Sequence, residues 1–188
     1  MKDKKVPRID FEPAASPETL NLLISLLQSH EWYTRENARL ALTEIGEPAV
    51  VLLIGALANN DWHVRWEAAK ALAEICDPSA APALVGTLND TRFGVRWLAA
   101  QGLICLGAGA LQPVLQSLLH KGDSYWVRWG VQYVLHELMP KADPRIRDVL
   151  RPVTAALSGP EPSVEVPVAA KRALETLAQQ RHERLLVA

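Results

Sequence analysis

The feature that most constrains the fold of this chain is an internal repeat. The triplet Val-Arg-Trp begins at residues 64, 95 and 127, so it recurs in steps of 31 and 32 residues. Each triplet lies near the start of an amphipathic pattern, as in WHVRWEAAKALAEI at 62–75. A weaker copy precedes these at 33–45, and a fifth is expected at 166–177. Self-similarity at this period predicts stacked units that share one elongated core.

Apolar helices are predicted between the copies, at about 17–28, 48–58, 78–88, 109–119 and 143–157. Most of them have Pro near the start, behind Ser, Glu or Asp, which is a helix-start signal. No segment alternates with the period of a strand. The expected fold is therefore all-α, an α-α superhelix in the form of a right-handed solenoid of about five antiparallel helix pairs. Pro113 and Pro152 fall later in their helices and are expected to bend them.

The domain organisation follows from the repeats. Residues 1–15 are expected to be an N-terminal arm, and residues 16–187 a single solenoid. The last copy is rich in Arg, Glu and Gln from 171 to 184, a composition that suits a polar cap. The predicted repeats lie at about 16–46, 47–76, 77–107, 108–140 and 141–187.

Composition narrows the function classes. Lys plus Arg number 20 and Asp plus Glu 21 among 188 residues, so no overall basic charge favours nucleic acid. No apolar stretch is expected to reach the roughly 18 residues of a membrane span, and the N-terminus has no signal-peptide pattern. A soluble, cytoplasmic protein is the expectation. Cys76 and Cys105 are expected to be ordinary thiols, because they form no disulfide framework and lack metal-type spacing with His.

The aromatic residues fall on one side of the predicted helices. With Val64 at 0° and about 100° per residue, Ala68, Leu72 and their neighbours form the buried stripe, and positions 62 and 66 point away from it. Trp and Tyr at such positions are typical of binding surfaces. Through the repeats, these positions give the columns Trp32, Trp62, Phe93, Tyr125 and Glu36, Trp66, Trp97, Trp129, and one turn later Leu40, Lys70, Gln101, Tyr133.

The repeat motif resembles the HEAT repeats, most closely those of the phycobilisome-lyase type. The matching residues are Asp61, the triplet 64–66, Ala68, Ala69, Leu72 and Ile75. The resemblance is strong over 16–140 and weak over 141–180. It implies that the second helix of each pair lines a concave side, and that an Arg column makes a structural ladder between repeats. Its members are Arg35, Arg65, Arg96 and Arg128, with Glu31, Asp61, Asp90 and Asp123 as acceptors.

The resulting prediction is a non-catalytic scaffold that binds a protein segment on an aromatic-lined concave groove. An extended, polyproline-II or helical peptide would suit it. Three alternatives stay open: Trp side chains as structural lids over Arg, an accessory subunit of a bilin lyase or related modifying enzyme, and a nucleic-acid-binding HEAT-like protein, which the charge disfavours. The expected partner-binding residues are Trp32, Trp62, Trp66, Lys70, Phe93, Trp97, Gln101, Tyr125, Trp129 and Tyr133.

No catalytic residue, metal site or cofactor is predicted. His-Glu pairs begin at His30, His136 and His182, but they do not fall in the inner-helix position where HEAT-like iron enzymes carry theirs. The apolar helix 48–58 is expected to need covering, either by the N-terminal arm or by another subunit. A weak homodimer through this helix is therefore a further expectation.

Overall fold

The computed structural model describes residues 16–120 and 124–187, with side chains described up to residue 180. The predicted arm 1–15, Asp123 and the side chains of His182 and Glu183 lie outside this part. The α-helices are α1 (Pro17–Leu26), α2 (Trp32–Ile45), α3 (Glu47–Ala56), α4 (Trp62–Ile75), α5 (Ala81–Thr87), α6 (Phe93–Leu106), α7 (Leu111–His120), α8 (Tyr125–Leu138), α9 (Pro144–Leu157) and α10 (Pro162–Val187).

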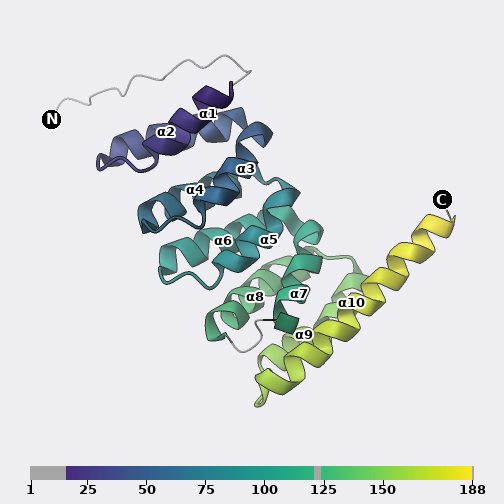
Figure 1. Ribbon diagram of the computed structural model, residues 1–188. Helices are drawn as coiled ribbons and strands as arrows, with labels where there is room; N and C mark the ends of the chain where they lie inside the picture. The colour runs from purple at the N-terminus through teal and green to yellow at the C-terminus, as the bar shows by residue number, and fades with distance from the viewer. Residues whose placement is uncertain (1–15, 121–123, 188) are drawn as a thin grey trace.

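The first eight helices stack as pairs in two rows (Figure 1). We call α1, α3, α5 and α7 the first row, and α2, α4, α6 and α8 the second row. Consecutive helices of the second row contact one another along its whole length. The predicted helices at 62–75, 93–106 and 125–138 coincide with α4, α6 and α8. The all-α solenoid expected from the repeats is therefore confirmed.

Small residues bring the second-row helices close together. Ala68, Ala69 and Ala100 are completely buried, and Val64 and Leu72 extend the same core. A Cβ on Gly130 would stand 2.9 Å from Leu88 Cδ2, so a larger residue would force the Leu88 side chain at the end of α5 to move. Close packing of this kind tolerates few volume changes.

Three of the second-row helices, α2, α4 and α6, end at a residue with positive φ. Gly46 after α2 and Gly107 after α6 have φ of 76° and 58°, a region that suits glycine. Cys76 takes the equivalent place after α4 with φ of 61°, the single non-glycine residue with positive φ in the described part of the chain. After α4, therefore, a residue with a side chain adopts a backbone conformation that favours glycine.

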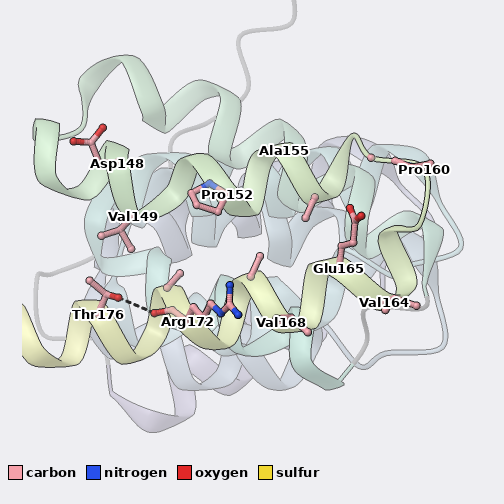
Figure 2. A pocket seen from close by; sticks show the side chains of 14 residues that line it. Asp148, Val149, Pro152, Ala155, Pro160, Val164, Glu165, Val168, Arg172 and Thr176 are labelled. Carbon is pink, nitrogen blue, oxygen red and sulfur yellow. Dashed lines mark hydrogen bonds between the residues drawn. The ribbon is translucent and has the colours of Figure 1, made fainter.

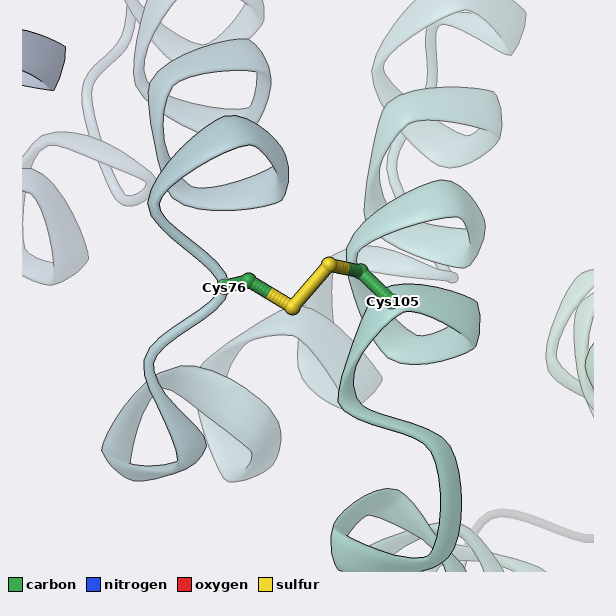
Figure 3. The surroundings of a disulfide bond; sticks show 2 residues. All are labelled: Cys76 and Cys105. Atoms are coloured by element: carbon green, nitrogen blue, oxygen red, sulfur yellow. A yellow bond between two sulfur atoms is a disulfide. The ribbon is translucent and has the colours of Figure 1, made fainter.

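A disulfide bond joins Cys76 to Cys105 near the end of α6 (Figure 3). The expectation of two ordinary thiols is therefore wrong. Adjacent second-row helices lie side by side, so residues separated by 29 positions, slightly less than one repeat, come within 5.9 Å at their Cα atoms. The bond is typical of oxidising compartments, which weighs against a cytoplasmic location. The cytoplasmic location predicted from the sequence is not tested by the structure and stays a prediction.

The last helix pair is swapped relative to the preceding ones. α9 packs beside α8 of the second row, whereas α10 packs beside α7 of the first row and beside α9. The start of α9 also resembles the start of a second-row helix. Asp143 caps α9 as Asp61 caps α4, and Arg147 Nη2 donates to a carbonyl of the preceding turn, Ala142 O, at 3.1 Å. The fifth copy expected at 166–177 thus belongs to α10, outside the second row.

Two expectations about single segments also change. Pro113 stands third in α7, where its missing N–H has no helical partner to lose, so it does not interrupt the helix. In α3, Val50 and Leu53 are buried and Val51 is the large residue left exposed. The homodimer expected through α3 therefore loses most of its apolar surface.

One stretch of the described chain, Phe93–His120, is long and apolar enough to cross a membrane by length and composition. The expectation that no such stretch exists is thus wrong. It comprises α6, a 3₁₀ turn from Gly107 to Ala110, and α7, and Leu103, Leu115 and Leu118 within it are core residues without exposed surface. Part of its hydrophobicity therefore belongs to the core of the solenoid, with 44 % of the apolar window buried.

Candidate binding face

The structure places most of the predicted rings on the outward side of the second row. We call them the aromatic face: Trp32, Trp62, Trp66, Phe93, Trp97, Tyr125, Trp129 and Tyr133. In the column of position 62, Trp32 is 65 %, Phe93 58 % and Tyr125 61 % exposed, while Trp62 is half-buried. In the column of position 66, Trp97 is 37 % exposed, while Trp66 and Trp129 are half-buried. The face is therefore continuous along the solenoid but uneven in depth.

Four rings of the aromatic face form a connected cluster across α6 and α8. The ring centroids of Trp97 and Tyr133 are 5.0 Å apart, and Trp129 stacks on Tyr133 at 6.1 Å. Phe93 lies 6.3 Å from Trp97 and 6.2 Å from Trp129. Gln101 Nε2 donates to the Tyr133 hydroxyl at 3.2 Å and holds that ring in place. These contacts preorganise the rings, so little side-chain entropy is left to lose on binding.

Trp66 sits at the seam between α4 and α6. Its Cδ1 and Nε1 lie 3.4 Å from the point where a Cβ on Gly94 would stand, so the indole edge covers that glycine. Lys70 Nζ lies 5.0 Å from the centre of the Trp66 ring. Both the lid and the binding interpretation apply to this residue, because one side packs and the other stays partly accessible.

A pocket of about 330 Å³ opens on this face between α2 and α4. Its walls are aromatic, and its floor carries charged side chains. Pockets of this size accept a side chain or a small ligand. The lining residues are Trp32, Arg35, Glu36, Arg39, Trp62, His63, Trp66 and Glu67.

The floor of this α2–α4 pocket is a buried ion pair that the sequence reasoning missed. Arg39 and Glu67 are 3 % and 5 % exposed, with Arg39 Nε 3.2 Å from Glu67 Oε2. Those two atoms approach outside hydrogen-bond geometry, and Arg39 Nη1 donates to Glu74 Oε2 at 2.8 Å. Burial raises the pKa of Glu67, against the lowering effect of Arg39 and Arg35. The sequence did indicate that Arg39 is buried, because its position in the repeat is the one occupied by the buried Ala69 and Ala100.

The Arg column binds backbone carbonyls as well as carboxylates. Arg65 Nη1 donates to Asn59 O at 2.8 Å, and its Nε and Nη2 donate to the Asp90 carboxylate of the next repeat. Burial favours a higher pKa for Asp90, but the hydrogen bonds from Arg65 and the Arg92 N–H outweigh it and lower that pKa. Arg65 thus links the turn before α4 to the turn before α6.

The other members of the expected ladder differ. Arg35 Nη1 donates to Ser29 O at 2.8 Å, and its nearest carboxylate is Glu67 at 3.9 Å, so neither Glu31 nor Asp61 accepts from it. Asp61 instead accepts from His63 N at 2.9 Å, which lowers the pKa of Asp61. Arg96 donates to the Asp90 carbonyl at 2.7 Å. Arg128 holds the equivalent position on α8.

Trp126 is a second residue that the sequence reasoning missed. The Arg96 guanidinium carbon lies 3.9 Å from the centre of its ring, closing the junction between α6 and α8. A similar contact joins Arg92 to Trp62 at 4.9 Å. The expected stacking of a Trp side chain over a neighbouring Arg therefore exists. Its shortest contact, however, is made by Trp126, which is in register with position 63 and belongs to none of the predicted aromatic columns.

The helix that carries the fifth copy lies away from the aromatic face. Arg172 and Glu175 belong to α10, which packs on α7 and α9. Across the residues that the structure describes, no group of three or more His, Cys, Asp or Glu side chains could hold a metal ion. The chemistry available on the aromatic face is therefore stacking, apolar burial and hydrogen bonding.

The architecture defines the protein as an α-solenoid built from helical repeats. A family model for HEAT repeats matches residues 51–136, so this part of the chain is similar to HEAT repeats; the phycobilisome-lyase subtype is not part of that match. No curated protein matches the chain.

Two similar solved structures are engineered proteins from the Northeast Structural Genomics Consortium. The first is 22 % identical, with a TM-score of 0.43, over 86 % of this chain and 80 % of its own. The second is 23 % identical, with a TM-score of 0.41, over 84 % of this chain and 80 % of its own.

Proposed function

We propose that this protein is a non-catalytic scaffold that holds an extended protein segment along the aromatic face. The observation that carries the proposal is the set of exposed rings on three second-row helices, Trp32 on α2, Phe93 and Trp97 on α6 and Tyr125 on α8, with half-buried rings between them on α4. Large exposed aromatic side chains on a rigid support are typical of binding hot spots. HEAT repeats are a repeat scaffold, which agrees with this role.

The spacing of the rings supports an extended occupant. Helices packed side by side lie about 8–10 Å apart, so that successive rings of one column are separated by a similar distance. A polyproline-II segment advances roughly 9 Å per turn of three residues. Every third residue of such a segment could therefore contact the ring of the next helix.

The proposed segment is anchored at two places. The α6–α8 ring cluster offers a broad apolar platform around Trp97 and Tyr133. The α2–α4 pocket, about 330 Å³, offers a recess for one side chain between Trp32 and Trp66. Arg39 and Glu67 in its floor balance each other in charge, so the recess suits an uncharged or aromatic side chain.

A displayed library of linear peptides tests the proposal directly. The library is selected on the purified full chain and, in parallel, on a variant with Trp32→Ala and Trp97→Ala. The proposal expects peptides that are enriched by the wild type and lost on the variant. Selection of the same peptides by both proteins, or no enrichment by the wild type, would overturn it.

A further inference from the structure

A broad concave surface lies away from the aromatic face. It is a groove of about 940 Å³ between α9 and α10, at the end of the solenoid, with the earlier helices behind it (Figure 2). Val149, Pro152 and Ala155 line it from α9, and Val164 and Val168 from α10. Val164 is 64 % and Val168 50 % exposed. The apolar residues of this groove are thus accessible although the end repeat also exposes charged side chains, among them Lys171 and Glu175.

The exposed side of α10 has an ordered charge pattern. Glu165, Val168 and Arg172 fall within about 60° of one another at roughly 100° per residue. The order along the helix is acid, apolar, base. Figure 2 shows Glu165 and Arg172 projecting between the two helices at opposite ends of this stretch. Neither has an ion-pair partner among the side chains described up to residue 180.

This pattern is complementary to itself. Two copies of α10 that meet antiparallel, centred near Val168, place Glu165 of each copy opposite Arg172 of the other. The two Val168 side chains then meet at the centre and cover the apolar groove. A two-fold axis doubles every contact, so a dimer of this kind contains two such ion pairs.

We propose that the α9–α10 end of the solenoid is a homodimer interface, with a second copy of this chain as its occupant. Charge complementarity selects this arrangement over head-to-tail stacking, because it pairs both unpartnered charges of the groove at once. The aromatic face lies along the second row and stays free in such a dimer. The proposal is therefore independent of the proposed function.

Sedimentation equilibrium of the full chain over a wide concentration range tests it. The wild type is expected to approach twice the 20.7 kDa of one chain as concentration rises. Val168→Asp is expected to stay monomeric with an unchanged circular dichroism spectrum. Val51→Asp, on the exposed side of α3, is the matched control and should dimerise like the wild type.

Charge reversal separates this arrangement from other associations. Glu165→Arg and Arg172→Glu should each weaken the dimer by about tenfold, and the double variant should restore it. A wild type that is monomeric at all concentrations, or a dimer that Val168→Asp leaves intact, overturns the proposal. So does a mass that grows beyond the dimer, as head-to-tail stacking would produce, or a double variant as weak as the single ones.

Discussion

Arg65 and Asp90 join the second and third repeats through a two-pronged contact. Arg65 Nε lies 2.6 Å from Asp90 Oδ2, and Arg65 Nη2 lies 3.1 Å from Asp90 Oδ1. The same guanidinium donates to two carbonyls of the turn before its own helix. The planar fork of arginine suits this geometry, and a lysine would supply only one point of charge.

Acid should weaken this junction. The pKa of Asp90 is lowered in the folded chain, so the folded state favours the ionised carboxylate. The stabilisation is fully present above the pKa of an unfolded Asp and is lost as the pH falls through the lower folded-state value. Denaturant unfolding of the wild type and Asp90→Asn is expected to differ at neutral pH and to converge in acid. A constant difference at all pH values would contradict the assigned role of the carboxylate.

The buried pair Arg39 and Glu67 should show strong coupling. Arg39→Ala leaves Glu67 without its closest partner and is expected to cost about 3 kcal/mol. Glu67→Leu is expected to cost less, because Arg39 keeps its hydrogen bond to Glu74. The double variant copies the next junction, where Ala69 and Leu98 stand at these positions, and should cost far less than the sum. Urea unfolding of all four proteins measures the coupling. Additive single effects would mean that the two charges do not interact.

The disulfide should stabilise the solenoid mainly through the unfolded chain. Closing a loop of about 30 residues contributes roughly 3–4 kcal/mol in the chain-entropy account. Cys76→Ser with Cys105→Ser removes the bond and keeps a side chain at positive φ. Cys76→Gly with Cys105→Ser removes the bond and relieves the backbone, so it should be about 1 kcal/mol more stable than the first pair.

Guanidinium unfolding with and without a reductant checks this order. Both double variants should be insensitive to reductant, and the Ser pair should match the reduced wild type in stability. Equal stability of the oxidised wild type and the Ser pair would show that the bond contributes nothing.

Trp126 serves stability rather than binding. Its ring covers Arg96, and Trp126→Ala should lower the free energy of unfolding by about 1 kcal/mol or slightly more through lost stacking and packing. Trp126 is 45 % exposed and its ring lies 5.0 Å from that of Tyr125, but its stacking on Arg96 of the preceding repeat is expected to leave peptide binding unchanged when it is removed. Parallel measurements of thermal unfolding and peptide affinity test both statements. Lost affinity with unchanged stability would reverse this assignment.

The sequence predicts the regular part of the fold well because every copy carries the same information. α4, α6 and α8 each begin two residues before a Val-Arg-Trp triplet and bury the same stripe. The swap of α9 and α10 was not predicted, since the row that a helix joins depends on tertiary contacts. Its one local signal was Asp143 followed four residues later by Arg147.

The sequence predicted which face of the helices carries the rings, but not how deeply each ring is buried. A helical wheel places Trp66 and Trp97 at one angle, and it does not show that Trp66 covers Gly94 of the next helix. It also treats each helix alone, so it misses pairs formed across a junction, such as Arg39 with Glu67 and Arg96 with Trp126. The Cys76–Cys105 disulfide is another pair of this kind, because the two residues meet only when repeats stack.

The affinity of one selected peptide for three proteins tests the central claim most directly. Fluorescence anisotropy of the labelled peptide would be measured with the wild type, Trp97→Ala and Trp126→Ala, each checked for folding by thermal unfolding. The account predicts that Trp97→Ala binds at least about tenfold more weakly while Trp126→Ala binds like the wild type. Equal affinity of the wild type and Trp97→Ala would contradict binding on the aromatic face.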